Sequence, residues 1–250
     1  MLIQLCSDLH LEFKENRDWL KKHPLVAKGE VLIIAGDTFH LDKNFESLDF
    51  IKKVSDEFKM TYLIPGNHEY YGGFDVATAM NSSRIEIKKN VVLVHNVTEH
   101  IEGVHFIFST LWSKIQKNIL EVYRGMTDFR RIKYQGNPFT INDFNTIHDA
   151  CFEFIKKEVA KEGKKIVVTH HLPSDACNAQ EFMRSVLNDA FCVDKTDFIS
   201  RSDIDYWIYG HSHRNLPDFT IGKTKMITNQ LGYLGMNEHR TFNFEKVIDI

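Results

Sequence analysis

Short apolar runs recur along the chain, separated by longer segments in which apolar residues return every three or four positions. The length of these runs and their content of β-branched residues favour buried strands. The predicted strands cover residues 2–6, 31–35, 61–65, 91–95, 104–109, 165–169 and 206–210.

Two of the intervening segments have the periodicity of amphipathic helices. In residues 44–59 the apolar side chains fall on one face at steps of three and four. In residues 140–163, Thr140 and Asp143 resemble a capping box, and Gly163 is suited to end the helix. Strands that alternate with helices in this way predict an α/β fold with buried sheets.

The last part of the chain has a different pattern. Residues 223–235 and 241–250 contain short alternating strands with turn residues, which predicts antiparallel pairing and a second sheet packed on the first. No repeat, low-complexity tract or linker rich in proline or serine interrupts residues 1–250. We therefore expect one domain, with a loop and helix insert near residues 110–140.

The bulk composition is that of an ordinary soluble protein, with 43% hydrophobic and 26% charged residues. A formal net charge of −3 argues against a broad surface for nucleic acid, which normally needs a basic excess. The four cysteines form no CxxC pair and fit a reducing compartment. No apolar run approaches the ~18 residues of a membrane span, and no signal-peptide pattern is visible. We expect a soluble, cytoplasmic protein without membrane contact.

Candidate chemistry gathers where the apolar runs end. Five of the runs are followed within a few residues by aspartate, histidine or asparagine. In open α/β sheets the carboxyl ends of the strands form the edge where ligands bind, so these side chains are expected to meet. They are Asp8, His10, Asp37, Asn67, His68, His170, His171, His211 and His213.

These residue types suit a metal site. Carboxylate, imidazole and amide oxygen bind borderline-to-hard divalent ions, and the absence of cysteine argues against a structural zinc site. Seven ligands drawn from this set are too many for one tetrahedral ion but suit two ions ~3.5–4 Å apart. Taken singly, a D-x-H, a Gly-Asp or a Gly-Asn-His segment is also common in turns. The five together, each after a strand, favour the metal interpretation.

The five segments resemble the calcineurin-like metallophosphoesterase superfamily, whose pattern is D-x-H, G-D-x-x-D, G-N-H-[DE], H and G-H-x-H. Here they read SDLH, GDTFH, GNHE, THH and GHSH, beginning at residues 7, 36, 66, 169 and 210. Smaller features in 109–113, 126–133, 170–174 and 229–233 resemble a bacterial and phage subgroup of phosphoesterases with unassigned substrates. The resemblance implies a four-layer α/β/β/α sandwich of two packed mixed sheets flanked by helices.

The resemblance also implies a ligand set for two divalent ions, with Mn²⁺ expected and Fe, Zn, Ni or Co as alternatives. Asp37 would bridge them, because its two oxygens and its negative charge can serve both cations. His170 is favoured over His171 because it directly follows the strand, while His171 would lie beside the site in either case. The remaining ligands would be Asp8, His10 and His213 for the first ion, and Asn67 and His211, with His170, for the second.

The same resemblance implies the roles of the residues around the ligands. A metal-bound hydroxide would attack phosphorus in line. His68 would protonate the leaving-group oxygen or stabilise its charge. Glu69 is expected to support the site, orienting His68 as carboxylates often orient imidazoles. His40 replaces the second aspartate of G-D-x-x-D, which is a supporting position and usually not a direct ligand. We therefore expect this change to alter the geometry around the ligands more than it alters metal binding.

The predicted insert near 110–140 interleaves cations with aromatic residues, which could receive a phosphate and a planar group. We expect Arg130 or Arg131 to approach the substrate. The alternative is a solvated, charged insert with no contact to substrate.

Three functions fit the sequence. The first is a two-metal hydrolase of phosphodiesters or phosphomonoesters on small molecules or nucleotides. The second is a nuclease acting on DNA or RNA, which the net charge disfavours. The third is a catalytically silent metal-binding scaffold, against which the retained His68 and the intact ligand set argue.

Overall fold

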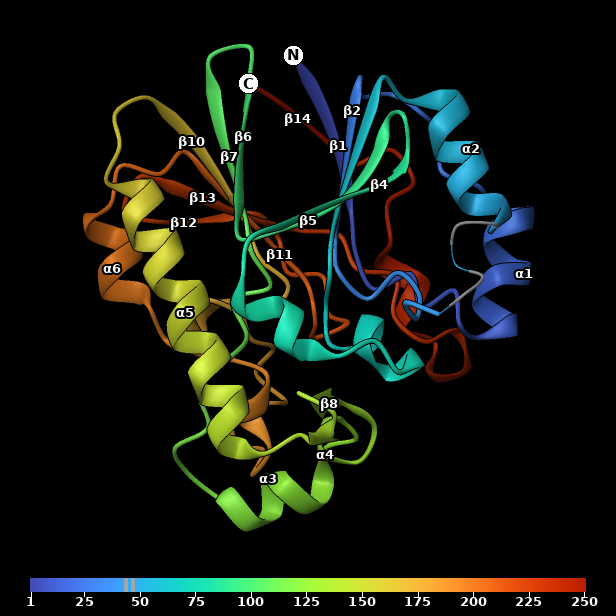
Figure 1. The fold of residues 1–250 in the computed structure, drawn as a ribbon. Coiled ribbons are helices and arrows are strands. Elements are labelled where there is room, and N and C mark those ends of the chain that lie inside the picture. Colours follow the sequence, from blue (N-terminus) through green and yellow to red (C-terminus); the bar gives the residue numbers. More distant parts are fainter. Residues whose placement is uncertain (43–44, 46–47) are drawn as a thin grey trace.

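Two six-stranded mixed sheets form the centre of the fold, and Figure 1 shows them side by side in its upper half. The computed structural model describes residues 1–42, 45 and 48–250. The first sheet has the order β14-β1-β2-β3-β5-β4. Its strands are β1 Leu2–Cys6, β2 Val31–Ala35, β3 Met60–Ile64, β4 Ser83–Lys88, β5 Val91–His95 and β14 Val247–Asp249.

The second sheet has the order β12-β13-β11-β10-β7-β6. Its strands are β6 Val97–Ile101, β7 Val104–Phe108, β10 Lys164–Val168, β11 Tyr206–Tyr209, β12 Phe219–Ile221 and β13 Thr224–Thr228. In both sheets the central strands are parallel and the two outermost strands are antiparallel to their neighbours. The carboxyl ends of the parallel strands therefore lie at one edge of each sheet.

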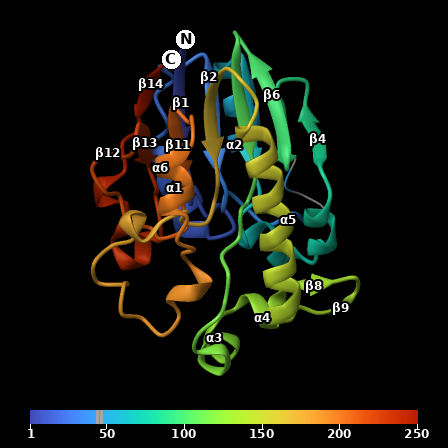
Figure 2. The same ribbon diagram turned by 90° about the vertical axis from the view of Figure 1, so that its left-hand side faces the viewer.

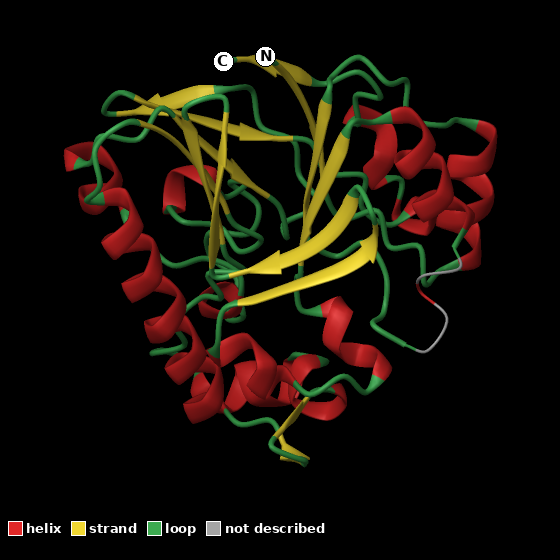
Figure 3. Cartoon of the chain, turned by 45° about the horizontal axis from the view of Figure 1, so that its top comes forward, coloured by secondary structure: helices red, strands yellow, loops and turns green. Residues whose placement is uncertain are grey.

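Helices cover the outer face of each sheet, as Figure 3 shows, which gives the predicted α/β/β/α layers. Ile33 of β2 and Phe106 of β7 face the core between the sheets. Ile34 faces outward under α1 (Lys14–Lys22) and α2 (Asp49–Glu57), while Ile107 faces outward under α5 (Ile141–Val159) and α6 (Thr196–Arg201). Successive strand residues point to opposite faces, so burial of both faces explains why the strands are continuous apolar runs.

A smaller layer lies below the sheets, at the foot of α5 (Figures 1 and 2). It comprises α3 (Ile119–Gly125), α4 (Asp128–Arg131) and the short pair β8 (Lys133–Tyr134) and β9 (Asn137–Pro138). Phe129 and Phe139 of this insert share a hydrophobic core with Tyr70 and Tyr71. The tyrosines belong to a 3-10 helix, η2 (His68–Gly72), so the insert packs directly against the chain that follows Asn67.

Five further 3-10 helices complete the described part of the chain. They are η3 Val76–Met80, η4 Asp175–Cys177, η5 Asn188–Ala190, η6 Leu234–Met236 and η7 Glu238–Thr241. None of the described helices combines the length and the apolar character needed to cross a bilayer.

The predicted strands are all confirmed, with shifts of one residue at some ends. The helix predicted at 44–59 is shorter: α2 covers Asp49–Glu57, and residues 44, 46 and 47 lie outside the described residues. The capping box of Thr140 and Asp143 is confirmed, but α5 ends at Val159 instead of reaching Gly163. Because β10 already starts at Lys164, the intervening residues are needed to reverse the chain, and Gly163 lies there with a φ of 107°.

The prediction for the tail is only partly right. β12 pairs antiparallel with β13, and β14 pairs antiparallel with β1, as the turn-rich pattern indicated. β13 itself is parallel to β11, because the chain first runs in the opposite direction as the edge strand β12 and then turns into β13, which lies between β12 and β11. The last strand thus closes the first sheet, next to the amino-terminal strand.

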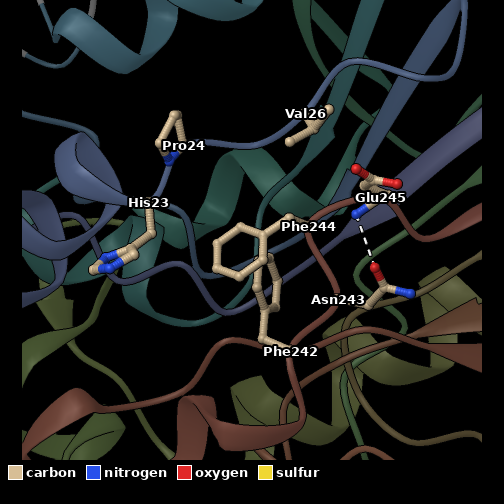
Figure 4. A pocket seen from close by; sticks show the side chains of 7 residues that line it. All are labelled: His23, Pro24, Val26, Phe242, Asn243, Phe244 and Glu245. Atoms are coloured by element: carbon tan, nitrogen blue, oxygen red, sulfur yellow. Dashed lines mark hydrogen bonds between the residues drawn. The ribbon is translucent and has the colours of Figure 1, made fainter.

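A shallow cavity of about 500 Å³ lies on the outer side of the first sheet. Phe242 and Phe244 stand side by side within it, with His23 and Pro24 along one side (Figure 4). It shares no residue with the side chains predicted to bind metal, which lie at the carboxyl ends of the strands.

Candidate metal centre

The loops after β1, β2, β3, β10 and β11 bring the predicted ligands together. Asp8, His10, Asp37 and His213 each offer one atom within 4.8 Å of those of the others. The Nε2 atoms of His10 and His213 are 2.9 Å apart, and Asp8 Oδ1 lies 3.4 Å from His213 Nε2. Carboxylate oxygens and imidazole nitrogens converging at such distances form a first group that can hold a cation.

A second group contains Asp37, His170 and His211. His170 Nε2 lies 3.4 Å from Asp37 Oδ1 and 3.0 Å from His211 Nδ1. The other oxygen of Asp37, Oδ2, lies 3.8 Å from His10 Nε2 in the first group. The two oxygens of one carboxylate therefore face two separate groups of imidazoles.

The buried side-chain oxygen of Asn67, Oδ1, has no hydrogen-bond partner among the described residues. The side-chain nitrogen of Asn67 donates to Asp128 and to the hydroxyl of Tyr71, each at 3.0 Å, which orients the amide. Leaving a buried acceptor unpaired costs ~1–3 kcal/mol. A divalent cation would satisfy this oxygen, so the donor set fits metal ions.

The backbone at the site is unusual. Asp8, His10, Asp37, His211 and His213 all have positive φ values, between 48° and 76°. Non-glycine residues avoid this left-handed region, and each such residue costs on the order of 1–3 kcal/mol. Backbone strain of this kind clusters at functional sites, because it aims side chains that a relaxed turn would not bring together.

The glycines of the motifs allow the loops to approach one another. A Cβ atom on Gly66 would lie 2.2 Å from Asp37 Oδ1, and one on Gly36 would lie 2.4 Å from His170 Nδ1. A Cβ atom on Gly210 would lie 2.7 Å from Asp8 Oδ2. Since real Cβ contacts are essentially never under 3.0 Å, any side chain at these positions would displace a candidate ligand.

The charges of the site are strongly coupled. Burial opposes ionisation of Asp37, yet the imidazoles of His170 and His68 hold the pKa of its carboxyl well below the usual value. Burial also disfavours the charged form of His170, but Asp37 raises its pKa to about 9. Burial and the neighbouring imidazoles lower the pKa of His211 well below its usual value. Because the pKa of His170 is raised, a cation that binds at its imidazole would have to displace a proton.

Glu69 supports the backbone of the site. Its carboxylate accepts hydrogen bonds from the amides of Asp37 (3.0 Å), Thr38 (2.7 Å), Phe39 (3.2 Å) and Gly66 (2.6 Å). The prediction that Glu69 orients His68 is therefore wrong. Successive residues of a 3-10 helix point ~120° apart, so the side chain next to His68 in sequence faces another direction.

Glu12, which the sequence analysis missed, contacts His68 instead. Its Oε1 accepts from Nδ1 of His68 at 2.7 Å and from Nδ1 of His10 at 3.0 Å. Burial raises the pKa of the Glu12 carboxyl, but the two imidazoles outweigh it and bring the value to about 2. The available signal was an acidic residue on the same loop, two positions after His10.

Glu238 holds His213 in a similar way, and it too was missed. Its Oε2 accepts from His213 Nδ1 and from the amide of Tyr233, both at 2.8 Å. Burial opposes protonation of His213, but Asp8 and Glu238 raise its pKa to about 10. Arg214 Nη1 donates to the other oxygen of Glu238 at 3.0 Å.

The two other supporting histidines lie on different sides of the site. His40 is at the rim, with its ring 6.4 Å from that of His68 and its Nε2 4.0 Å from Glu12 Oε1. His171 is fully buried, 4.2 Å from the ring of His211 and stacked on Trp112 at 5.2 Å. His171 belongs to neither group of candidate ligands, whereas His170 does.

The two arginines singled out in the sequence are already engaged within the insert. Arg130 donates from Nη1 to the carbonyl of Arg124 at 2.7 Å and from Nη2 to Thr127 at 3.3 Å. Arg131 donates to the carbonyl of Tyr71 at 3.0 Å, and its guanidinium lies 5.6 Å from the centre of the Tyr71 ring. Of the two, Arg131 is the one placed against η2, next to the site.

Sequence comparison now decides the family. A profile of the calcineurin-like phosphoesterases matches residues 1–215. The chain belongs to this family. It is also 28% identical to an uncharacterized protein of Acanthamoeba polyphaga mimivirus, over 100% of this chain and 96% of that protein.

One solved structure shows the same fold. The phosphopantetheinyl hydrolase of Mycobacterium tuberculosis superposes with a TM-score of 0.70 at 15% identity, covering 98% of this chain and 95% of that one. A dimetal phosphatase of Danio rerio gives a TM-score of 0.44 at 14% identity, covering 92% and 87% of the two chains. The first match confirms the arrangement of the two mixed sheets and their flanking helices.

Proposed function

We propose that this calcineurin-like phosphoesterase uses two divalent cations to hydrolyse phosphodiester or phosphomonoester bonds of small molecules or nucleotides. The observation that carries the proposal is the placement of Asp37. Its Oδ1 faces His170 at 3.4 Å and its Oδ2 faces His10 at 3.8 Å, so one carboxylate can serve two ions. We assign Asp8, His10 and His213 to the first ion and Asn67, His170 and His211 to the second.

The ligand set suits Mn²⁺, with Fe, Zn, Ni or Co as alternatives, because it combines carboxylate, imidazole and amide donors. When bound, such a pair of cations supplies Lewis acidity and lowers the pKa of water so that it can act as a nucleophile near neutral pH. The buried walls of the site exclude bulk solvent, which strengthens every charge interaction within it.

His68 is the proton donor in this proposal. Its ring is largely buried, and Nε2 lies 3.3 Å from the hydroxyl of Tyr233 and 4.0 Å from Asp37 Oδ2. Burial lowers the pKa of His68, but Asp37 and Glu12 outweigh it and the net shift is upward. A protonated Nε2 at the mouth of the site can pass its proton to the leaving-group oxygen as the phosphorus–oxygen bond breaks.

A reconstituted activity panel tests the proposal. The purified chain is stripped with a chelator, loaded with Mn²⁺ and assayed on bis-p-nitrophenyl phosphate, p-nitrophenyl phosphate, cyclic nucleotides and single-stranded DNA. We expect turnover of the small esters, bound metal at two ions per chain, and a loss of at least ~10²-fold for Asp37→Asn. Asp197→Asn, an exposed residue of α6, is the matched control and is expected to match wild type.

Two results would contradict the proposal. One is a folded Asp37→Asn variant with wild-type turnover and both ions bound. The other is a fully loaded wild-type protein that cleaves only the DNA, which would favour the nuclease, or nothing at all, which would favour the silent scaffold.

A further inference from the structure

Position 40 is where this chain departs from the family pattern, with histidine in place of an acidic residue. An imidazole that donates a proton from Nε2 needs an acceptor for the hydrogen on Nδ1. Without that acceptor the ring is free to rotate. His40 does not contact His68 Nδ1, since the two rings are 6.4 Å apart. The acceptor at this place is Glu12 instead, at 2.7 Å.

Glu12 serves two rings at once. A carboxylate without a proton can only accept, so the Nδ1 atoms of His10 and His68 are both donors toward Oε1. The two rings lie 4.5 Å apart in an edge-on arrangement. With both Nδ1 atoms held, Nε2 of His10 faces Asp37 and His213, while Nε2 of His68 faces Tyr233.

The main chain at Glu12 is itself fixed. Arg17, on the first turns of α1, donates from Nη1 to the carbonyls of Leu11 (2.5 Å) and Glu12 (2.9 Å). Asn16 donates to the carbonyl of Leu9 at 3.0 Å. The loop between the first pair of candidate ligands and α1 is thus clamped by the helix, and the Glu12 side chain is only 8% exposed.

We propose that Glu12 is a positioning residue that fixes the ring of the proton donor His68 relative to that of the metal ligand His10. This inference rests on the proposed function, because it concerns the same leaving-group step. Glu12 acts through the two imidazoles and needs no contact with the substrate. The competing interpretation is that Glu12, His10 and His68 themselves bind a cation, since their donor atoms also lie within 4.8 Å of one another.

The test compares Glu12→Ala and Glu12→Gln with Glu15→Gln, an exposed residue of α1 that serves as the matched control. For each variant, metal content and kcat are measured with a p-nitrophenyl ester and with an alkyl ester of phosphate. The alkyl ester has the poorer leaving group and depends more on a proton donor. We expect Glu12→Ala to keep two ions and lose ~10–100-fold in kcat on the alkyl ester, with a much smaller loss on the p-nitrophenyl ester.

Two more arms separate positioning from a general structural effect. In a His68→Ala background, Glu12→Ala is expected to cost much less on the alkyl ester than it does in the wild-type background, because most of its effect on that ester acts through His68. Glu12→Gln keeps an acceptor oxygen, and it is expected to recover part of the loss. Ring ¹⁵N–¹H spectra of the metal-free protein should show His68 with hydrogen on Nδ1 in wild type and a mixture of tautomers in Glu12→Ala.

Equal losses on both esters, full additivity with His68→Ala, or unchanged ring spectra would overturn the inference. Loss of one bound ion in Glu12→Ala would overturn it in favour of direct metal binding. If the loaded wild-type enzyme proves inactive on every ester, the proposed function fails, and the metal-free ring spectra still decide whether Glu12 fixes His68.

Discussion

The carboxylate of Asp128 accepts a 3.0 Å hydrogen bond from the side-chain amide of Asn67, a residue 61 positions earlier in the chain. Asp128 also accepts from the hydroxyl of Tyr71. These contacts hold the amide nitrogen and so fix the orientation of the Asn67 side chain, whose Oδ1 is buried without a hydrogen-bond partner. Asp128 lies on α4, so the insert at 110–140 supports the site through a buried carboxylate.

Replacement of Asp128 by alanine should weaken the second ion selectively. The amide of Asn67 would lose its orientation, and removal of such a supporting partner typically costs ~10–100-fold in metal affinity or activity. Metal titration of the stripped variant, read by competition with a chromogenic chelator, measures the effect. Asp149→Ala, which removes only an exposed ion pair with Lys114, is the control. Unchanged affinity for both ions in Asp128→Ala would show that Asn67 needs no such support.

A methyl group at Gly66 should disable the site. The added Cβ atom would lie 2.2 Å from Asp37 Oδ1 and 2.7 Å from His170 Nε2, so one of these side chains must move. A misplacement of ~1 Å can cost ~10²-fold in rate, and Gly66→Ala is expected to lose at least that much. Gly235→Ala, where nothing lies within 4 Å of the new Cβ atom, should behave as wild type. The kcat of both loaded variants on p-nitrophenyl esters provides the comparison.

Acid should destabilise the fold partly through His148. Burial lowers the pKa of this imidazole to about 4, whereas an exposed histidine has a pKa of ~6.5. The unfolded chain thus binds the proton more readily, so the stabilisation is complete above pH ~6.5 and is lost as the pH falls toward 4. The difference corresponds to about 3 kcal/mol, as an order of magnitude.

Urea unfolding of the metal-free protein at pH 7 and at pH 4 measures this loss. Nδ1 of His148 donates to the carbonyls of Leu111 (3.1 Å) and Trp112 (3.2 Å), and the amide of a glutamine can replace that donor. His148→Gln should therefore lose about 3 kcal/mol less than wild type between the two pH values. An identical loss in the two proteins would assign the acid sensitivity to other groups.

Removal of the metal should lower the melting temperature of the wild-type protein. Free cation at ~100 times its Kd stabilises the fold by ~2.7 kcal/mol, which for a chain of this size corresponds to ~5–10 °C. Thermal unfolding with Mn²⁺ and with excess chelator gives the shift directly. Asp37→Asn should show little or none of it, since the carboxylate shared by the two groups is gone. A full shift in that variant would place the stabilising ion elsewhere.

The two neighbouring arginines of α4 should behave differently toward substrate. Arg131 lies against Tyr71 beside the site, and we propose that it leaves the Tyr71 carbonyl to meet the phosphoester. Arg131→Ala is then expected to raise KM by ~10-fold, the value of one charged hydrogen bond. Arg130, which binds the carbonyl of Arg124, is the matched control. Equal KM values across wild type and both variants, on several esters, would remove arginine from substrate binding.

The strand that each candidate ligand follows could be predicted from the sequence, because each segment contains both an apolar run and the polar side chain after it. An apolar run that ends in Asp8, Asp37 or His170 identifies both the strand and the side chain at its carboxyl end. The parallel centre of each sheet then brings those ends together. Local sequence was sufficient for this part of the fold and the candidate site.

The residues that orient those side chains could not be found in the same way. Glu12 lies 56 residues from His68, and Glu238 lies 25 residues from His213, so each pairing depends on how loops cross in space. Glu69 was misassigned because it neighbours His68 in sequence, although its carboxylate caps four main-chain amides on the other side of the loop. Contacts between loops that are distant in sequence produce no periodic pattern in a single sequence, so they could not be predicted from it.

Five candidate ligands have a left-handed main chain, which lowers the stability of the fold but places their side chains in the site: Asp8, His10, Asp37, His211 and His213. Glycine at any of these positions would remove the backbone strain but would also remove a candidate metal ligand. The sequence that is most stable without metal therefore differs from the sequence that can bind metal. Selection for heat-resistant variants of this enzyme would therefore tend to replace the candidate metal ligands first, unless divalent cations are present during the selection.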